Sequence, residues 1–313
     1  ELKRLKVHVI RPSINNCFAE FKADTNKIFY GLGAIKSVGF EAVSNIVNER
    51  EKNGKFNTFT DFINRVDPKD INKLQLEGLV KAGAFDEIDL NRKKLYDDIP
   101  KIIQTIKSKY DEKVSNQTNL FDEINNKDNE TFKFSSTKSW TKKELLAEEF
   151  ASLGFYISDH PLNEYKEFFT QLEINSYKDF INSNKPESLV AGTIMSVQEK
   201  KSAKGNSYAI IKFSDNKSEF EIFLFADLFA SNRDKLIESN SFILTLHKDR
   251  NVGENNLTRV NIRKIVDLSD LVNKTYQSVS IELNNREKLK ELNELLKNNG
   301  DTTINVILRE SNK

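Results

Sequence analysis

Cysteine, histidine and long apolar runs are scarce in this chain of 313 residues. With a single thiol, Cys17, the chain cannot form an internal disulfide. The sequence therefore gives no indication that the protein works in an oxidising compartment. No apolar run approaches the roughly 20 residues that a membrane-spanning helix needs, and no signal-peptide pattern occurs. The chain begins at Glu1 rather than Met, within what reads as structured sequence. We therefore expect a cytoplasmic fragment of a longer protein, without a membrane partner.

The sequence also lacks an excess of either charge and any recognisable catalytic cluster. Its 48 basic and 47 acidic residues exclude a surface that is basic all over, but they permit local basic patches. The three histidines, His8, His160 and His247, lie in separate segments, and no Cys or His pair has metal-ligand spacing. The acidic pairs at 97–98 and 148–149 diverge across a helix surface. We expect no catalytic residue, metal ligand or cofactor site in this chain.

The first part of the chain changes from a helical pattern to a polar one. Residues 1–110 show apolar residues at helical spacing, interrupted by glycine-bearing turns, which predicts a compact helical module. A pattern of helix, glycine turn and helix occurs twice in this module, near 32–50 and again near 71–97. Residues 111–139 are rich in Asn, Lys, Asp, Ser and Thr, with isolated Phe132 and Phe134. That composition predicts a flexible linker.

Residues 140–188 are predicted to form a helical connector. A helix is expected to start at Thr141, because Thr141 and Glu144 have the spacing of a capping box. The turn at His160 and Pro161 is interpreted as a structural elbow rather than as part of a reactive centre.

Residues 189–268 switch to the period-two pattern of β-strands. Three strands, a helix and two more strands are expected, in the order of an OB-fold, a small barrel that often binds single strands. The strands are predicted at 189–198, 207–213, 220–225, 241–247 and 258–265, and the helix at 226–237. In the third strand Phe220, Ile222 and Leu224 alternate with Glu221, Phe223 and Phe225, and the pattern leaves open which set faces the core.

Residues 269–313 read as strand, helix and strand, a small and truncated α/β unit. The predicted fold class is therefore multidomain: an all-α helix-hairpin-helix module, an all-β OB-fold barrel and this partial α/β tail.

The first candidate binding site is the turn Ile35-Lys36-Ser37-Val38-Gly39. A tight turn between two helices exposes the backbone N–H groups of the second helix, which suit a DNA phosphate, and Lys36 adds charge. The pattern resembles a helix-hairpin-helix, with Ser37 where such hairpins usually have their first glycine. Lys36, Ser37, Val38 and Gly39 are the predicted DNA-binding residues. The alternative is an ordinary helix turn.

A second unit, Leu79-Val80-Lys81-Ala82-Gly83-Ala84-Phe85, resembles a degenerate partner hairpin. The stronger interpretation there is that Gly83 simply ends a helix as its C′ residue.

The third candidate is the peptide Gln117-Thr118-Asn119-Leu120-Phe121 within the polar linker. Adjacent Leu120 and Phe121 serve no local core in such a segment, and they suit a partner's apolar pocket, with Gln117 supplying a directional hydrogen bond. The peptide resembles those that bacterial replication proteins insert into the sliding clamp. Gln117, Leu120 and Phe121 are the predicted clamp-binding residues.

The fourth candidate is the basic loop between the first two barrel strands, which contains Lys200, Lys201 and Lys204. In OB-folds this loop and the neighbouring strand face bind oligonucleotides, so these lysines are candidate contacts to single-stranded DNA. The alternatives are a solvated turn for the loop and core packing for each nearby aromatic residue.

Together these motifs resemble the C-terminal half of the bacterial replicative DNA polymerase III alpha subunit, a C-family polymerase. The resemblance covers almost the whole chain and is most specific in its last stretch. Its residues are Tyr30-Gly31-Leu32-Gly33-Ala34-Ile35-Lys36-Ser37-Val38-Gly39, Asn72-Lys73, Leu79-Val80-Lys81-Ala82-Gly83-Ala84-Phe85-Asp86, the peptide 117–121 and Leu153-Gly154-Phe155-Tyr156-Ile157-Ser158-Asp159-His160-Pro161-Leu162.

The resemblance implies the end of the fingers region, tandem hairpins, a clamp peptide, an OB domain and a tail that contacts the tau subunit of the clamp loader. It implies that the intact protein is a DNA-directed DNA polymerase whose Mg²⁺-binding aspartates lie upstream of Glu1, and that this piece alone is inactive. Two alternatives are a free-standing repair scaffold with a hairpin and an OB domain, and an RNA-binding module of a synthetase-like enzyme.

Overall fold

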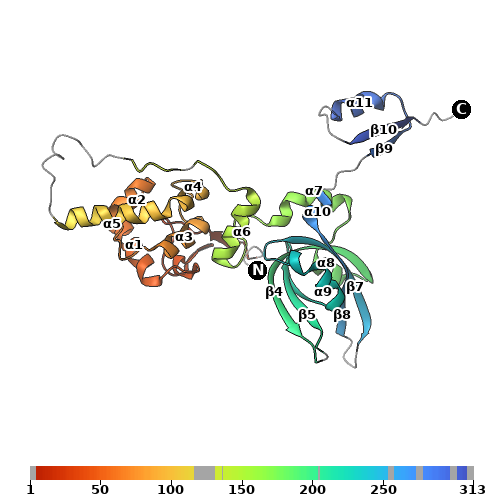
Figure 1. Ribbon diagram of the computed structural model, residues 1–313, viewed down its shortest axis with the longest axis horizontal. Helices are drawn as coiled ribbons and strands as arrows, with labels where there is room; N and C mark the ends of the chain where they lie inside the picture. The colour runs from red at the N-terminus through yellow and green to blue at the C-terminus, as the bar shows by residue number, and fades with distance from the viewer. Residues whose placement is uncertain are drawn as a thin grey trace.

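The computed structural model describes residues 5–115, 131–135, 137–203, 205–252, 257–272, 278–296 and 302–308 (Figure 1). It contains a helical module, a connector, a five-stranded sheet and a small C-terminal unit.

The helical module holds six helical segments within residues 32–115. They are η1 (Leu32–Ala34), α1 (Phe40–Asn53), α2 (Phe59–Arg65), α3 (Lys73–Lys81), α4 (Arg92–Asp97) and α5 (Ile99–Ser115). Their shared core is rich in phenylalanine: Phe62 contacts both Phe56 and Phe85 edge to face, with ring centroids 5.3 and 4.9 Å apart. Edge-to-face ring pairs stabilise a core beyond the contribution of the apolar area that they bury.

A small sheet precedes the helices, so the all-α prediction is wrong for residues 8–29. Its strands are β1 (His8–Ile10), β2 (Lys22–Asp24) and β3 (Lys27–Phe29), in the order β1-β3-β2. β1 runs parallel to β3, and β2 antiparallel. Strands of three residues are too short to show an alternating pattern in the sequence.

The end of the predicted linker, which spans residues 111–139, lies against the helical module. Phe132 and Phe134, which stand among polar residues in the sequence, contact its core, and the N–H of Phe132 donates to Oγ1 of Thr60 at 3.0 Å. Trp140 lies against Tyr96, with ring centroids 5.5 Å apart. The prediction of a flexible linker is therefore wrong for residues 132–135, because the tertiary fold provides an apolar surface that the local sequence does not reveal.

The connector consists of α6 (Lys142–Leu153), η3 (Pro161–Tyr165), α7 (Lys166–Gln171) and α8 (Tyr177–Asn182). The predicted capping box is confirmed: Thr141 accepts from the N–H of Glu144 at 3.3 Å, and the Glu144 carboxylate accepts from the N–H of Thr141 at 2.8 Å. Gly154, with φ +84°, ends α6 in the left-handed conformation that glycine adopts most easily.

The five-stranded sheet follows the predicted order. Its elements are β4 (Glu187–Lys201), β5 (Ser207–Ser214), β6 (Glu219–Leu224), α9 (Ala226–Asn232), η4 (Arg233–Lys235), β7 (Ser241–Val252), β8 (Leu257–Asp267) and α10 (Leu268–Val272). All neighbouring strands are antiparallel, in the order β6-β5-β4-β7-β8. Cα atoms of β6 and β8 come within 8 Å of each other, but no ladder joins them within the described residues. The closed barrel is thus not confirmed.

The structure also decides which face of β6 is core. Phe220, Ile222 and Leu224 are buried, whereas Phe223 and Phe225 are 46% and 48% exposed. Glu221 shares the outer face with Phe223, because alternate strand residues point the same way.

The C-terminal unit consists of β9 (Ser278–Leu283), α11 (Lys288–Leu295) and β10 (Thr303–Leu308). The two strands are parallel and in register from Ser278 with Thr303 to Leu283 with Leu308. This agrees with the predicted strand, helix and strand.

Candidate nucleic-acid interface

The turn between η1 and α1 forms a tight hairpin. Ser37 has φ +67°, in the left-handed region that disfavours residues with a Cβ. This conformation explains why hairpins of this kind usually have glycine there. Gly39 follows as the N-cap of α1, with φ −76° and ψ 136°. Lys36, Ser37 and Gly39 are exposed, whereas Val38 is buried and anchors the turn.

The first turn of α1 presents unpaired donors. Gly39 has no side chain to cap the helix, and within the described residues no acceptor is recorded for the N–H groups of Phe40, Glu41 or Ala42. Free N–H groups and the positive end of the helix dipole together favour an anion. Glu41 is exposed in the same turn and carries the opposite charge to Lys36.

The hairpin is held from two sides. The N–H of Lys36 donates to the carbonyl of Ser152 in α6 at 3.0 Å. The carbonyl oxygen of Lys36 lies against Gly78 of α3, and a Cβ atom built on Gly78 would be only 2.7 Å from that oxygen. The helix α3 thus approaches the turn more closely than any residue other than glycine permits.

Arg50, on the same helix as the hairpin donors, belongs to the core instead. It is buried, and its Nη1 donates to the carbonyls of Ile14 at 2.9 Å and Cys17 at 2.6 Å. Burial lowers the pKa of this guanidinium from its usual value. Its role is to join α1 to the segment before β2.

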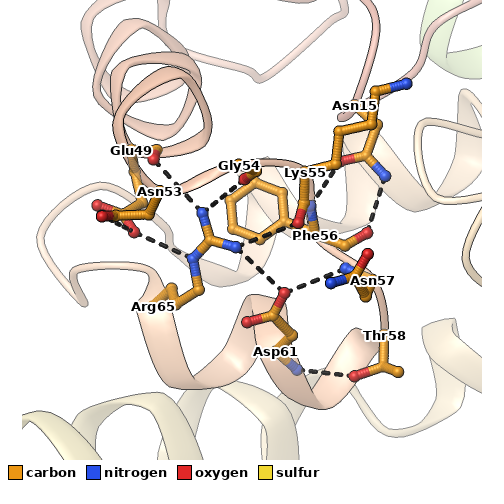
Figure 2. A network of polar contacts seen from close by, with 10 residues as sticks. All are labelled: Asn15, Glu49, Asn53, Gly54, Lys55, Phe56, Asn57, Thr58, Asp61 and Arg65. Atoms are coloured by element: carbon orange, nitrogen blue, oxygen red, sulfur yellow. Dashed lines mark hydrogen bonds and ion pairs between the residues drawn. The ribbon is translucent and has the colours of Figure 1, made fainter.

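The other end of α1 is fixed by Arg65 of α2 (Figure 2). Its Nε donates to Oε1 of Glu49 at 3.0 Å, its Nη2 to the carbonyl of Gly54 at 2.8 Å, and its Nη1 to Oδ2 of Asp61 at 3.1 Å. The guanidinium also lies 4.4 Å from the ring centroid of Phe56. These contacts hold the C-terminal end of α1, so both ends of the hairpin helix are tied to the module.

Gly83 in the second unit ends α3 with φ +78°, and the next helix begins only at Arg92. The interpretation of Gly83 as a C′ residue is therefore confirmed. A Cβ on Gly83 would lie 2.2 Å from Nη2 of Arg92, which bonds Asp86 at 2.6 Å. Nη1 of Arg92 lies 3.6 Å from Oε2 of the fully buried Glu149. These residues build the core, and tandem DNA binding by this unit stays a prediction.

The predicted clamp-binding residues Gln117, Leu120 and Phe121 lie outside the described residues. Lys204 also lies outside them. Lys200 and Lys201 form the exposed end of β4, and within the described residues no ion pair is recorded for either.

Aromatic side chains accompany Lys200 on the outer face of the sheet, whereas Lys201, the next residue of β4, points to the opposite face. Lys200 is opposite Tyr208 in the ladder, and the Tyr208 ring lies nearly parallel to that of Phe223, with centroids 6.4 Å apart. Arg259 of β8 lies over the Phe225 ring at 5.4 Å. Arg259 is not among the residues predicted from the sequence, because only the fold brings β8 beside the end of β6.

The stretch that most specifically resembled the polymerase family is the joint between the module and the sheet. Nδ1 of His160 accepts from the N–H of Leu162 at 3.2 Å, so Nε2 carries the proton and donates to Oγ of Ser214 at 3.0 Å. Burial lowers the pKa of His160 to about 4, although Asp215 and Asp159 oppose this. The Tyr156 hydroxyl donates to Ser239 at 3.1 Å. The predicted structural elbow is confirmed.

Two general properties of the described residues bear on function. Among them, no helix combines the length and apolarity needed to cross a membrane. In the same part of the chain, no group of His, Cys, Asp and Glu side chains is arranged to hold a metal ion.

Comparison with known proteins supports the presence of a helix-hairpin-helix in this chain. Residues 6–95, which contain the hairpin, match the helix-hairpin-helix motif family. The chain is 32% identical to the DNA polymerase III subunit alpha of Borreliella burgdorferi and 32% identical to that of Buchnera aphidicola, each over its full length. It is also 32% identical to the Campylobacter jejuni subunit over 82% of its residues. It spans 28% of the length of the first two relatives. The chain is thus homologous over its whole length to part of the bacterial DNA polymerase III alpha subunit, and the resemblance predicted from its motifs is confirmed.

Proposed function

We propose that this chain is the DNA-binding part of a replicative DNA polymerase and that it holds the enzyme on its primer–template. The hairpin at residues 36–39 carries this proposal. Its exposed Lys36, the left-handed turn at Ser37 and the free N–H groups of α1 form a site for a duplex phosphate, in a region that matches a helix-hairpin-helix family.

The outer face of the sheet is the proposed contact for the unpaired template strand. Lys200 supplies positive charge at one end of this face, and Tyr208, Phe223 and Phe225 supply flat apolar surfaces. Lys201 adds charge at the same end of β4 from the opposite face of the strand. Single-strand sites combine these two features, because every base presents a face that stacks on an aromatic ring. An OB-fold remains part of the proposal, supported by the strand order and the position of α9.

Two protein partners complete the proposal. Gln117, Leu120 and Phe121 would dock in the sliding clamp, and the C-terminal unit would contact the tau subunit. Polymerase chemistry, with its Mg²⁺ and aspartates, would belong to the part of the protein outside this chain, so the chain alone would be inactive. A free-standing repair scaffold is the other candidate. The similarity of the whole of this chain to polymerase subunits favours the polymerase over the scaffold.

Position 40 offers a direct test of the hairpin. Phe40 is the first residue of α1, where proline is well tolerated, and Gly39 already has the extended conformation that precedes proline. Phe40→Pro therefore removes one N–H donor without breaking the helix. Phe40→Ala removes the same ring but keeps the donor, which makes it the matched control.

The assay is the affinity of the chain for duplex DNA at low salt. Relative to Phe40→Ala, the proline variant should bind about tenfold more weakly, because a hydrogen bond to a charged group contributes about 1.5–3 kcal/mol. Equal affinity of the two variants would exclude the N–H of residue 40 from the interface and contradict the proposed hairpin site.

A further inference from the structure

Gln75 is the third residue of α3 and has one end of its side chain fixed. Oδ1 of Asn72 accepts from the N–H of Gln75 at 3.0 Å, and Oε1 of Gln75 accepts from the N–H of Asn72 at 2.8 Å. A backbone N–H can only donate, so the atom it meets must be the amide oxygen. The orientation of the Gln75 amide is therefore determined by the capping box.

This orientation directs the amide nitrogen to the hairpin. A Cβ built on Gly39 would lie 3.2 Å from Nε2 of Gln75. Within the described residues no acceptor is recorded for Nε2. Gln75 is in the first turn of α3 and Gly39 caps α1, so the positive ends of two helix dipoles lie side by side.

We propose that Nε2 of Gln75 is a further phosphate donor of the hairpin site. The capping box holds it beside the free N–H groups at the start of α1, where a DNA phosphate would accept from both helices. The hairpin is then a site built by two helices, and α3 takes part through a side chain that the hairpin motif does not include. This inference rests on the proposed DNA-binding function of the hairpin.

Gln75→Glu tests the donor while preserving the fold. Glutamate is as good as glutamine at the third position of a capping box, so the bond from Asn72 persists. The donor, however, becomes a negatively charged oxygen next to the phosphate. We expect duplex DNA affinity to fall at least tenfold, with an unchanged unfolding temperature. Gln104→Glu, on an exposed position of α5, is the control for net charge.

Gln75→Lys distinguishes a phosphate contact of residue 75 from a role in capping α3. Lysine keeps a donor but cannot accept the N–H of Asn72, so a residue needed only for capping would lose affinity with Lys but not with Glu. The proposal predicts that Gln75→Lys binds duplex DNA at least as tightly as the unmodified chain.

Several outcomes would overturn the inference. They are a Gln75→Glu affinity within twofold of the unmodified chain, an equal loss in Gln104→Glu, and an equal loss in Gln75→Lys. If one of these occurs while Phe40→Pro still binds more weakly than Phe40→Ala, only the role of Gln75 fails. If Phe40→Pro and Phe40→Ala bind equally, the proposed hairpin function itself fails.

Discussion

The carbonyl oxygen of Lys36 lies against Gly78 so closely that a methyl group at position 78 would be 2.7 Å from it. The same methyl group would lie 3.0 Å from Cγ2 of Val38. The position of the hairpin turn is thus determined by a glycine on a different helix, 42 residues later in the chain.

Gly78→Ala should therefore weaken both the fold and DNA binding. Alanine is favoured over glycine in a helix by about 1 kcal/mol, but overpacking against a backbone costs about 1–3 kcal/mol. We expect net destabilisation in urea unfolding and reduced affinity for duplex DNA. Leu74→Ala, at a 61% exposed position of the same helix, is the control and should change neither the stability nor the DNA affinity by much. A more stable Gly78→Ala variant would contradict the close approach.

Arg92→Met should destabilise the helical module by about 3–5 kcal/mol, because it leaves the buried Glu149 without its cation. The carboxylate would keep the N–H groups of Ile157 and Ser158, both within 2.9 Å of Oε1. Trp140 is the one tryptophan of the chain, so its fluorescence reports on this module during denaturant unfolding.

Adding Glu149→Gln to Arg92→Met should recover part of that loss, since the second change removes the uncompensated charge. Full additivity of the two substitutions would show that the two side chains do not interact.

His160 should make stability depend on pH between about 6.5 and 4. Its pKa is about 4 in the folded protein against an ordinary value of 6.5. Above 6.5 the histidine is neutral in both states and its contribution is complete. As pH falls to 4, the unfolded chain binds a proton that the folded chain rejects, and up to about 3 kcal/mol is lost.

His160→Asn is the matched variant, because asparagine can still accept the N–H of Leu162 at the helix start but does not titrate. It should be less stable at pH 7, where the bond to Ser214 is lost, and should show a flatter decline towards pH 4. Parallel stability curves for the two proteins would contradict the assigned role.

Single-stranded DNA affinity should fall when Phe223 and Phe225 are both replaced by alanine. Stacking on an aromatic ring contributes about 1–3 kcal/mol per base, so a loss of at least tenfold is expected for an oligothymidine probe. Phe21→Ala, at a 56% exposed ring of the helical module, is the control. If the double variant binds as well as this control, the outer face is not the single-strand site.

Clamp binding should depend on Leu120 and Phe121. In a pull-down with the purified sliding clamp, the double alanine variant should lose binding, because both apolar anchors of the pocket disappear. Thr118→Ala with Asn119→Ala changes the same peptide without removing the anchors and should still bind. Retention of the clamp by the anchor variant would remove this peptide from the proposed function.

Local pattern was sufficient for elements whose signal lies within a few residues. The capping box at Thr141 and Glu144 is made of neighbours, so its spacing predicted the start of α6. The strands of the five-stranded sheet were likewise readable from alternation, and the hairpin at Lys36 to Gly39 from its residue types. The three-residue strands β1 to β3 escaped detection, because such short strands carry no period.

By itself, the sequence determined the order of the elements of the five-stranded sheet, the hairpin motif, and a family resemblance that comparison confirmed. The tertiary structure alone decided which residues meet. It buried Arg50, used Gly83 and Arg92 for the core, and turned Phe223 outward. It also placed the Gln75 amide beside Gly39. These outcomes depend on contacts between residues far apart in the chain, and such contacts leave no periodic signal along it.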